Sequence, residues 1–483
     1  MELVTKGYAI PKNGLSKQNE SLILRELRVT PFIPGDYGKR PKPFKVYQED
    51  DNYYYVPRYW GINNFGQPPI VDYDITNTNF DVTFKGELRP YQKEIVEKLD
   101  KVFYNEHGQL NQYAGGIVSI PPGGGKTVIA INYLSKLKMK TLIIVHKSFL
   151  LDQWVERLQE YTDASIGIIR QNKAQVENKE VVIAMLQTLL CRDYDDFMKQ
   201  FSVVIIDEVH HTSAEGFSQV LPKIHSPYMI GLSATPERSD RLEKVFYWHI
   251  GDLLHRGEQK KNASAADVRM YYFKSDHEKF VTEVNKWTKK PNMAKMITNL
   301  TEIPERNDLI VDIIKQVVRR EPDRKVFLLT NRRNHIDDIF GRLKEIFPDD
   351  VGLYIGGMKK EKLKESEEKT VILGTYEMAS EGLDIQDLDT LILGTPKSNI
   401  VQSIGRIMRK QQGDYINTPL VIDIVDRLDV FYAMSYKRKK IYTTNKYNIQ
   451  YINLANQSLP GPVVDVPDSD DSDESGDGFD FVD

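Results

Sequence analysis

The sequence is poor in cysteine, because Cys191 is the only one among 483 residues. A single cysteine excludes a disulfide within the chain and favours a reducing compartment. Cys191 follows two leucines, so we expect its thiol to be a small core residue. His210 and His211 have no cysteine or further histidine at ligand spacing, which argues against a zinc site.

Long apolar runs are also missing. No stretch approaches the roughly 18 residues that a helix needs to span a bilayer. The first thirty residues are interrupted by Lys6, Lys12, Lys17, Glu20, Arg25 and Arg28. We therefore expect no membrane span, no secretory signal peptide and a location inside the cell. A repeat solenoid is not expected either, because no period of about 20 to 50 residues stands out.

Basic residues are absent from the last nineteen positions, 465–483, which hold nine acidic side chains. The formal net charge is −4, and it becomes +5 without this tail. A mildly basic body with an acidic appendage is typical of a nucleic-acid binder. The alternative is a disordered terminus that only aids solubility, and composition slightly favours this alternative.

The sequence does contain two series of short β-rich apolar runs that alternate with helix-like segments. Their continuous hydrophobicity indicates strands buried on both faces, as in parallel sheets covered by helices. Two such series predict an α/β fold with two tandem domains. The runs are 115–120, 141–145, 180–185, 201–207 and 228–234, then 325–330, 351–356, 370–375, 390–394 and 419–426.

Residues 1–85 differ from the rest, because prolines recur and basic residues alternate with aromatic ones. Such a surface could stack bases and neutralise phosphates. A small β-rich domain whose Tyr and Trp fill its core explains the pattern at least as well. The predicted segments are an accessory domain at 1–85, a first α/β domain at 86–255, a linker or insert at 256–300, a second α/β domain at 301–455, and a disordered acidic tail at 456–483.

One strand-to-helix junction, SIPPGGGKTVIA at residues 119–130, has the composition of a phosphate-binding loop. Its backbone N–H groups and the helix N-terminus would face an anion, with Lys126 near the terminal phosphates and the Thr127 hydroxyl suited to Mg²⁺. The consensus has a glycine where Ile120 stands, so a purely structural loop stays open at this point. The loop itself consists of Pro122, Gly123, Gly124 and Gly125, and glycine permits close approach and positive φ.

A second site follows at VVIIDEVHH, where Asp207 and Glu208 end an apolar run. Ligands of open α/β sheets bind at the carboxyl ends of the strands. Asp207 can hold Mg²⁺ through hard oxygen ligands, while Glu208 orients and deprotonates the attacking water. A lysine-bearing loop followed by paired acids is the division of labour for nucleotide hydrolysis.

A third element lies in the second domain, at VQSIGRIMRK. If this stretch is helical, Gln402, Arg406 and Arg409 lie on one face, at i, i+4 and i+7. Two arginines on one face can be a solvated basic surface. Facing the phosphate-binding loop they would be arginine fingers, which accelerate hydrolysis by about 10³ to 10⁵.

Together, these motifs resemble those of superfamily 2 helicases of the DExH kind, in the family's order between about residues 85 and 425. The resemblance implies two tandem RecA-like domains, ATP and Mg²⁺ as cofactors, and tolerance of Ile120 in the loop. LRPYQ resembles the adenine-reading element, which assigns Gln92 to the base. DEVHH and GLSATP imply that His210, Ser233 and Thr235 couple hydrolysis to the grip on nucleic acid. TYEMASEGLDI implies that Thr375 contacts nucleic acid and that Gly382 and Asp384 contact the nucleotide.

The nucleic-acid contacts that the resemblance implies are less specific. VHKSFLLDQW, AMLQTL and LLTNRRNH supply candidates that would grip the backbone without reading sequence. Ser148 has the alternative role of a helix N-cap. The basic stretch 437–440 is better explained as a solvated helix end than as a nucleic-acid contact. The candidates are Lys147, Ser148, Gln187, Thr188, Arg332, Arg333 and His335.

Within the superfamily, PPGGGKT, DQWVERL, GLSATPERSD and EGLDI are most similar to XPB-type and phage recombination helicases and to the transcript-release helicase of poxviruses. This resemblance implies an ATP-dependent translocase that moves on duplex or branched DNA and remodels duplexes or hybrids. It would be a monomeric motor in transcription, recombination or repair, with transcription or replication proteins as partners. If viral, it would work in the host cytoplasm or nucleus.

Three alternatives stay open. An RNA helicase is the nearest, because such motors grip phosphates and sugars of either polymer. The motor subunit of a nuclease is less favoured, since PDD at 348–350 and EEK at 367–369 lie on polar linkers between predicted strands. A non-catalytic binding protein is disfavoured by the intact Lys126, Asp207 and Glu208.

Overall fold

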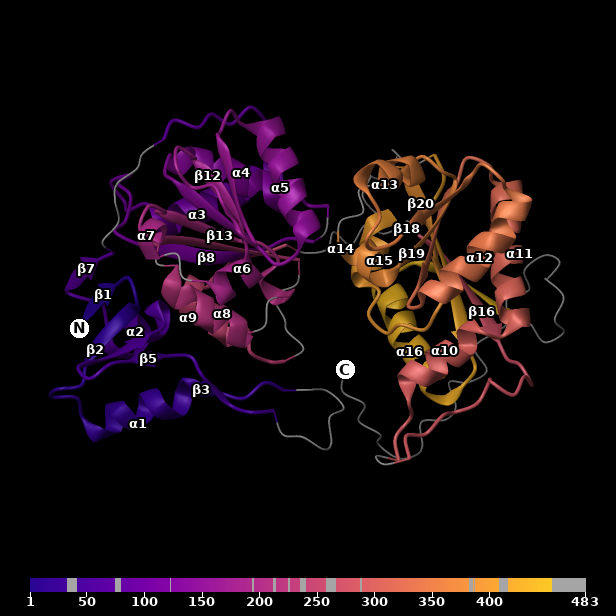
Figure 1. Cartoon of the computed structure of the whole chain (residues 1–483), viewed down its shortest axis with the longest axis horizontal. Helices are drawn as coiled ribbons and strands as arrows, with labels where there is room; N and C mark the ends of the chain where they lie inside the picture. Colours follow the sequence, from indigo (N-terminus) through magenta and orange to yellow (C-terminus); the bar gives the residue numbers. More distant parts are fainter. Residues whose placement is uncertain are drawn as a thin grey trace. The chain divides into compact units, whose positions relative to one another are not determined.

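The computed structural model describes residues 1–32, 41–73, 80–121, 123–192, 195–211, 214–224, 226–234, 240–257, 266–286, 289–381, 385, 387–407 and 416–453. These residues fall into two compact units whose boundary lies near residue 260. Figure 1 shows a sheet flanked by helices in each unit. No helix of the described part of the chain is long and apolar enough to cross a membrane.

The first unit begins with a small five-stranded sheet in the order β5-β6-β2-β1-β7. Tyr47, Tyr54 and Trp60 are buried in its core, as expected of a β-rich domain that its aromatic residues fill. The elements are β1 (Glu2–Val4), β2 (Gly7–Pro11), α1 (Lys17–Glu26), β3 (Arg28–Val29), β4 (Phe44–Lys45), β5 (Gln48–Glu49), β6 (Tyr53–Val56), α2 (Arg58–Phe65) and β7 (Ile70–Asp72).

This small domain packs against the rest of the first unit through α2. Buried Arg58 donates to the main-chain oxygen of Pro227 at 2.8 Å, at the start of a strand of the larger sheet. Its guanidinium also lies 5.0 Å from the ring centre of Tyr59. A carbonyl and an aromatic face therefore hold this buried cation in place.

The larger sheet of the first unit has the order β11-β10-β12-β9-β13-β14-β8-β15, and only β10 and β11 pair antiparallel. Its strands are β8 (Ala114–Ser119), β9 (Thr141–Val145), β10 (Ile166–Arg170), β11 (Lys173–Ala174), β12 (Val181–Met185), β13 (Val203–Ile206), β14 (Tyr228–Ser233) and β15 (Leu253–Arg256). The helices are α3 (Pro90–Phe103), α4 (Lys126–Leu137), α5 (Ser148–Tyr161), α6 (Leu186–Cys191), α7 (Asp195–Met198), α8 (Ala214–Val220) and α9 (Glu243–Ile250), with single turns η1 (Val209–His211) and η2 (Leu221–Lys223).

Both faces of this sheet are buried. Along β9, Leu142 and Ile144 belong to the core beneath α6, α8 and α9, whereas Ile143 and Val145 belong to the core beneath α3, α4 and α5. The apolar runs of the sequence are unbroken because every residue of such a strand faces one of the two hydrophobic layers.

The second unit has one seven-stranded sheet in the order β18-β19-β17-β20-β21-β16-β22, with every neighbouring pair parallel. Helices α11 and α12 lie on one side of it in Figure 1, and α14, α15 and α16 lie on the other. Its strands are β16 (Asp267–Phe273), β17 (Lys325–Thr330), β18 (Val351–Tyr354), β19 (Val371–Thr375), β20 (Leu388–Leu393), β21 (Leu420–Asp426) and β22 (Asn448–Asn453). The helices are α10 (Met293–Thr301), α11 (Pro304–Arg320), α12 (Arg333–Ile346), α13 (Lys360–Glu367), α14 (Tyr376–Glu381), α15 (Val401–Ile407) and α16 (Asp429–Thr444).

The prediction of an α/β fold with parallel sheets is confirmed, and each predicted apolar run overlaps a strand. The segment 256–300, expected to be a linker or insert, contributes strand β16 to the second sheet. The division into five segments otherwise stays a prediction. The expected acidic tail, 456–483, lies outside the described residues.

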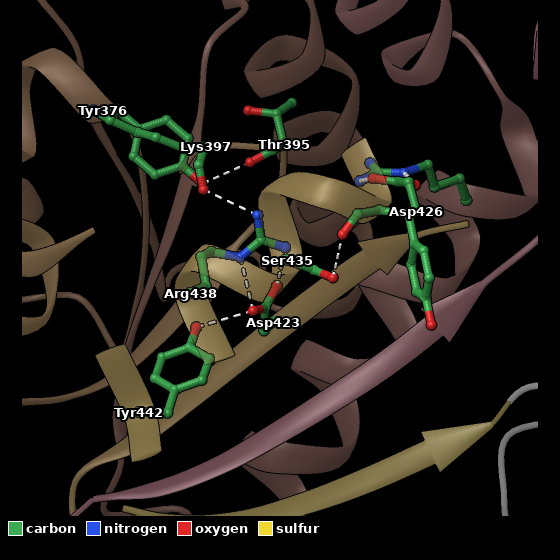
Figure 2. Close-up of polar contacts among 10 residues, drawn as sticks. Tyr376, Thr395, Lys397, Asp423, Asp426, Ser435, Arg438 and Tyr442 are labelled. Atoms are coloured by element: carbon green, nitrogen blue, oxygen red, sulfur yellow. Dashed lines mark hydrogen bonds and ion pairs between the residues drawn. The ribbon is translucent and has the colours of Figure 1, made fainter. Parts of the chain in front are cut away.

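Two buried ion pairs hold the loop that follows β20. Arg438 donates twice to Asp423, at 2.8 Å each, and once to the main-chain oxygen of Lys397 at 2.9 Å, as Figure 2 shows. Arg306 forms a similar pair with Asp426 and donates to the main-chain oxygen of Gly394 at 2.8 Å.

Two sequence expectations are wrong. The basic stretch 437–440 is not simply a solvated helix end, because Arg438 is 1% exposed and bonded to Asp423. Cys191 is exposed rather than a core residue. It ends α6, whose buried positions are Leu186, Thr188 and Leu189, so its thiol faces away from the core.

We predict that Arg438→Ala destabilises the second unit by about 3–5 kcal/mol, because it leaves the Asp423 carboxylate buried without a cation. Tyr442 donates to the same carboxylate at 2.9 Å, so Tyr442→Phe should cost about 1 kcal/mol. Urea unfolding of the full chain measures both values. Lys440→Ala, at an exposed position of the same helix, is the control and should change stability by less than about 0.5 kcal/mol. Equal losses in the three variants would contradict a specific role for the buried pair.

Candidate functional site

The phosphate-binding loop connects β8 to α4, at the carboxyl end of β8. Gly123 and Gly125 have φ of 77° and 75°, a conformation that favours glycine. A Cβ on Gly124 would lie 2.3 Å from Cγ2 of Ile120. Ile120, which replaces the consensus glycine, is 3% exposed and belongs to the core. The loop is thus tight because a core side chain presses against it.

Lys126 is the first residue of α4, so its ammonium stands at the start of a helix whose first N–H groups lack intrahelical partners. The Lys126 Nζ lies 2.7 Å from Oε1 of Glu208. Their side chains are 11% and 21% exposed, so water can reach this pair. The cation therefore has a carboxylate partner within the site.

Asp207 and Glu208 directly follow β13, the second neighbour of β8 in the sheet. Oδ1 of Asp207 accepts a hydrogen bond from the Glu208 main-chain N–H at 2.9 Å, and Oδ2 accepts one from Nε1 of Trp154 at 2.8 Å. Burial, followed by the nearby Glu208 carboxylate, raises the pKa of Asp207. Glu208 itself has a positive φ of 48°, a backbone strain that occurs typically at functional sites.

His210 lies between the acidic pair and the end of β14. Its Nδ1 is 2.9 Å from Oγ of Ser233 and 3.4 Å from Oε2 of Glu208. Two of the three residues expected to couple hydrolysis to nucleic-acid binding are thus in direct contact. Thr235, the third, lies outside the described residues.

Gln92, the expected reader of adenine, is 4% exposed on the first turn of α3. Its Oε1 accepts a hydrogen bond from the Arg89 N–H at 2.9 Å, and its Nε2 lies 3.5 Å from the main-chain oxygen of Gly124. Neighbouring Tyr91 donates to that same oxygen at 2.9 Å. Gln92 therefore lies against the phosphate-binding loop.

The first-unit candidates for nucleic-acid contact divide by exposure. Lys147 and Ser148 stand at the N-terminus of α5, where Lys147 rather than Ser148 is the N-cap residue. Gln187 is exposed and donates to the main-chain oxygen of His146 at 2.7 Å. Thr188 is buried, and its hydroxyl accepts from the Gln171 N–H at 3.1 Å.

The second-unit candidates lie at the carboxyl ends of β17 and β19. Arg332 donates to Oγ1 of Thr298 at 3.0 Å and to the Ala294 main-chain oxygen at 2.8 Å, which fastens it to α10. Arg333 is exposed, and Thr375 is partly exposed at the end of β19.

The expectation that His335 contacts nucleic acid is wrong. Its side chain is 1% exposed and bonded to Thr330 and Asn307. Burial lowers the pKa of His335 to about 3, so its ring is neutral.

Some predicted residues cannot be placed. Pro122, Gly382, Asp384 and Arg409 lie outside the described residues. Gln402 and Arg406 belong to α15, which confirms the predicted helix over 401–407, but their side chains are not described.

Sequence reasoning missed Trp154 as a partner of Asp207. Trp154 stands in the stretches VHKSFLLDQW and DQWVERL, which gave it no role of its own, although a buried indole N–H usually needs an acceptor. No group of three His, Cys, Asp or Glu side chains in the described ranges could hold a metal by itself. A cation at this site would need oxygen ligands from the nucleotide and water as well.

Two protein families match this chain. The family described as "Type III restriction enzyme, res subunit" matches residues 85–238, and "Helicase conserved C-terminal domain" matches residues 306–411. Among solved structures, an ATP-dependent Type ISP restriction-modification enzyme bound to DNA is 16% identical with a TM-score of 0.52. The match covers 78% of this chain and 32% of that one, and it shows the fold alone.

Relatives of this chain occur in large DNA viruses and in an archaeon. A protein of African swine fever virus named as an ATP-dependent RNA helicase is 27% identical over 74% of this chain and 73% of its own length. "DNA 3'-5' translocase XPB2" of Sulfurisphaera tokodaii is 24% identical over 74% and 85%. A protein of Acanthamoeba polyphaga mimivirus, named as an ATP-dependent RNA helicase, is 39% identical over 92% of this chain and 85% of its own. With this identity over most of its length and tandem RecA-like domains, the chain belongs to the superfamily 2 helicases, enzymes that hydrolyse ATP.

Proposed function

We propose that this chain is a translocase that hydrolyses ATP to move on DNA and to remodel duplexes or hybrids. The observation that carries the proposal is the Lys126–Glu208 ion pair beside buried Asp207, at the carboxyl ends of β8 and β13, two parallel strands of one sheet with β14 between them. These are the three groups that nucleotide hydrolysis requires of the protein.

The ion pair supports a defined order of events. While Lys126 is bonded to Glu208, the charge of the ammonium offsets that of the carboxylate. A γ-phosphate in the loop would compete for the lysine because it offers more negative charge at the helix N-terminus. Glu208, released from Lys126, then acts as the general base on the attacking water.

The site fits Mg²⁺, because Asp207 supplies a buried carboxylate near the phosphate-binding loop and nucleotide and water oxygens would complete the ligand set. We assign the metal to Asp207 and the Thr127 hydroxyl. The cost of burying the Asp207 charge, visible in its raised pKa, would be relieved by a cation. When bound, Mg²⁺ neutralises charge on the phosphate oxygens.

The remaining motif residues complete the proposal. Arg406 and Arg409 act as arginine fingers with Gln402 beside them, and His210, Ser233 and Thr235 couple hydrolysis to movement. Contacts between His210, Glu208 and Ser233 support this coupling role. Nucleotide binding is further assigned to Gln92, Pro122, Gly123, Gly124, Gly125, Gly382 and Asp384.

For the nucleic-acid track, we propose DNA, gripped in part by Lys147, Ser148, Gln187 and Arg333. Support comes from the likeness to an archaeal protein named as a DNA translocase. RNA is the second candidate, because the mimivirus and African swine fever virus relatives are named as RNA helicases. We further propose a monomeric motor that works with transcription or replication proteins.

We predict that Glu208→Gln lowers ATP turnover at least about a hundredfold, the usual scale for loss of a general base. ATP affinity should be kept or increased, since Lys126 no longer has a competing carboxylate. Steady-state hydrolysis and nucleotide binding measure the two effects. Glu160→Gln, at an exposed position paired with Arg157, is the control and should behave as wild type. Unchanged turnover in Glu208→Gln would remove Glu208 from the role of base.

The track is tested by ATPase assays of wild type and Lys126→Ala with no polymer, duplex DNA, single-stranded DNA and RNA in parallel. We expect duplex DNA to stimulate the wild type most, and Lys126→Ala to abolish hydrolysis with every polymer, because the γ-phosphate loses its cation. Stronger stimulation by RNA would make the second candidate correct. Stimulated hydrolysis in Lys126→Ala would refute the assignment of the nucleotide site.

A further inference from the structure

One contact in the nucleotide site comes from outside the motif residues assigned above. Trp154 lies in α5, two turns after the helix starts at Ser148, and its side chain is 1% exposed. Its Nε1 donates to Oδ2 of Asp207 at 2.8 Å. The other carboxylate oxygen, Oδ1, accepts from the Glu208 N–H. Each oxygen of Asp207 therefore has one fixed N–H donor.

Two donors on opposite oxygens fix the plane of a carboxylate, which otherwise rotates broadly about its last side-chain torsion. A fixed plane also fixes which lone pairs stay available to a cation. Indole N–H is only a donor and carries no charge. Trp154 can therefore orient Asp207 without neutralising it, whereas a lysine in its place would compete with the metal.

The charged partner nearby is occupied elsewhere. Lys126 pairs with Glu208 at 2.7 Å rather than with Asp207. The two acids are thus held differently, Glu208 by a cation that phosphate can displace and Asp207 by neutral donors of the protein. This difference matches their separate roles as base and metal ligand.

We propose that Trp154 is a positioning residue for the metal, holding Asp207 in the orientation that binds Mg²⁺ and linking helix α5 to the metal site. The inference rests on the proposed function, in which Asp207 is the metal ligand. The competing explanation is that the indole only packs in the core and needs any acceptor for its N–H. Under that explanation, removal of the N–H changes stability but not metal binding.

The test uses Trp154→Phe, which removes the N–H and keeps an aromatic ring. Groups that orient a metal ligand typically contribute about 10- to 100-fold to metal affinity. We therefore expect Trp154→Phe to raise the half-saturating Mg²⁺ concentration for ADP binding at least about tenfold. Its binding of ADP in the presence of a chelator should equal that of wild type, because the N–H that the substitution removes is bonded to Asp207, the proposed metal ligand.

A second readout is spectroscopic. Trp154 is one of four tryptophans, and the acceptor of its N–H is the proposed metal ligand. Addition of Mg²⁺ in the presence of ADP should therefore change the tryptophan emission of wild type. The change should persist in Trp248→Phe, a matched substitution in α9 at a partly buried tryptophan, and disappear in Trp154→Phe.

Asp207→Asn separates this inference from the proposed function. If Asp207→Asn and Trp154→Phe both raise the Mg²⁺ requirement, both stand. If only Asp207→Asn raises it, Trp154 merely packs and the inference is overturned. If neither raises it, Asp207 is not the metal ligand and the proposed metal assignment fails first. Should Trp154→Phe fail to fold, 3-benzothienylalanine at position 154, which has the shape of tryptophan without its N–H, gives the same comparison.

Discussion

In both units the two faces of the parallel sheet are buried under helices, and this burial decides where polar side chains can lie. In β9, side chains alternate between two hydrophobic layers, with Leu142 on one side and Ile143 on the other. An unpaired polar group in either layer is costly, so a polar side chain within such a strand needs a buried partner, as Asp423 of β21 has in Arg438. Polar groups that must stay accessible to a ligand are better placed at the strand ends, where the chain leaves the sheet. Asp207 and Ser233 both stand there, at the ends of adjacent strands β13 and β14.

The same constraint gives charged pairs two different uses. In the second unit, Arg306 and Asp426 have fully buried side chains and bond through two N–H groups, so the pair is a permanent part of the core. In the first unit, Lys126 and Glu208 share a single contact and are partly exposed. A ligand can exchange for the carboxylate there at moderate cost, because water already reaches both charges. Burial and the number of bonds thus separate a structural ion pair from an exchangeable one.

A structural feature could be predicted from the sequence where a short stretch of residues is enough to indicate it. Continuous apolar runs are local, and all ten indicated strands exist. Strand β16 lies inside the segment expected to be a linker, because DVRMYYF mixes charge and aromatics rather than forming a plain apolar run. Most residues of the edge strand β22 are exposed or partly exposed, so its sequence NIQYIN forms no plain apolar run either.

Contacts between distant residues explain the remaining failures. The basic residues around Arg438 indicate a solvated helix. The opposite indication lies elsewhere in the sequence, because Asp423 within the buried strand LVIDIVD needs a cation as its partner. Trp154 and Asp207 are 53 residues apart, with no fixed spacing to reveal the pair. The order of motifs predicted which residues gather at the strand ends, but not which neutral donor orients them.

The non-consensus Ile120 shows how packing decides what a motif tolerates. A glycine at the start of such a loop is needed only if another backbone must approach it closely. Here the Ile120 side chain enters the core and occupies the space that a Cβ of Gly124 would need. The large residue at 120 and the glycine at 124 therefore depend on each other, because either position can be filled only if the other leaves room. The phosphate-binding backbone keeps its shape since Gly123 and Gly125 supply the positive φ angles, and the core gains an isoleucine where the consensus has no side chain.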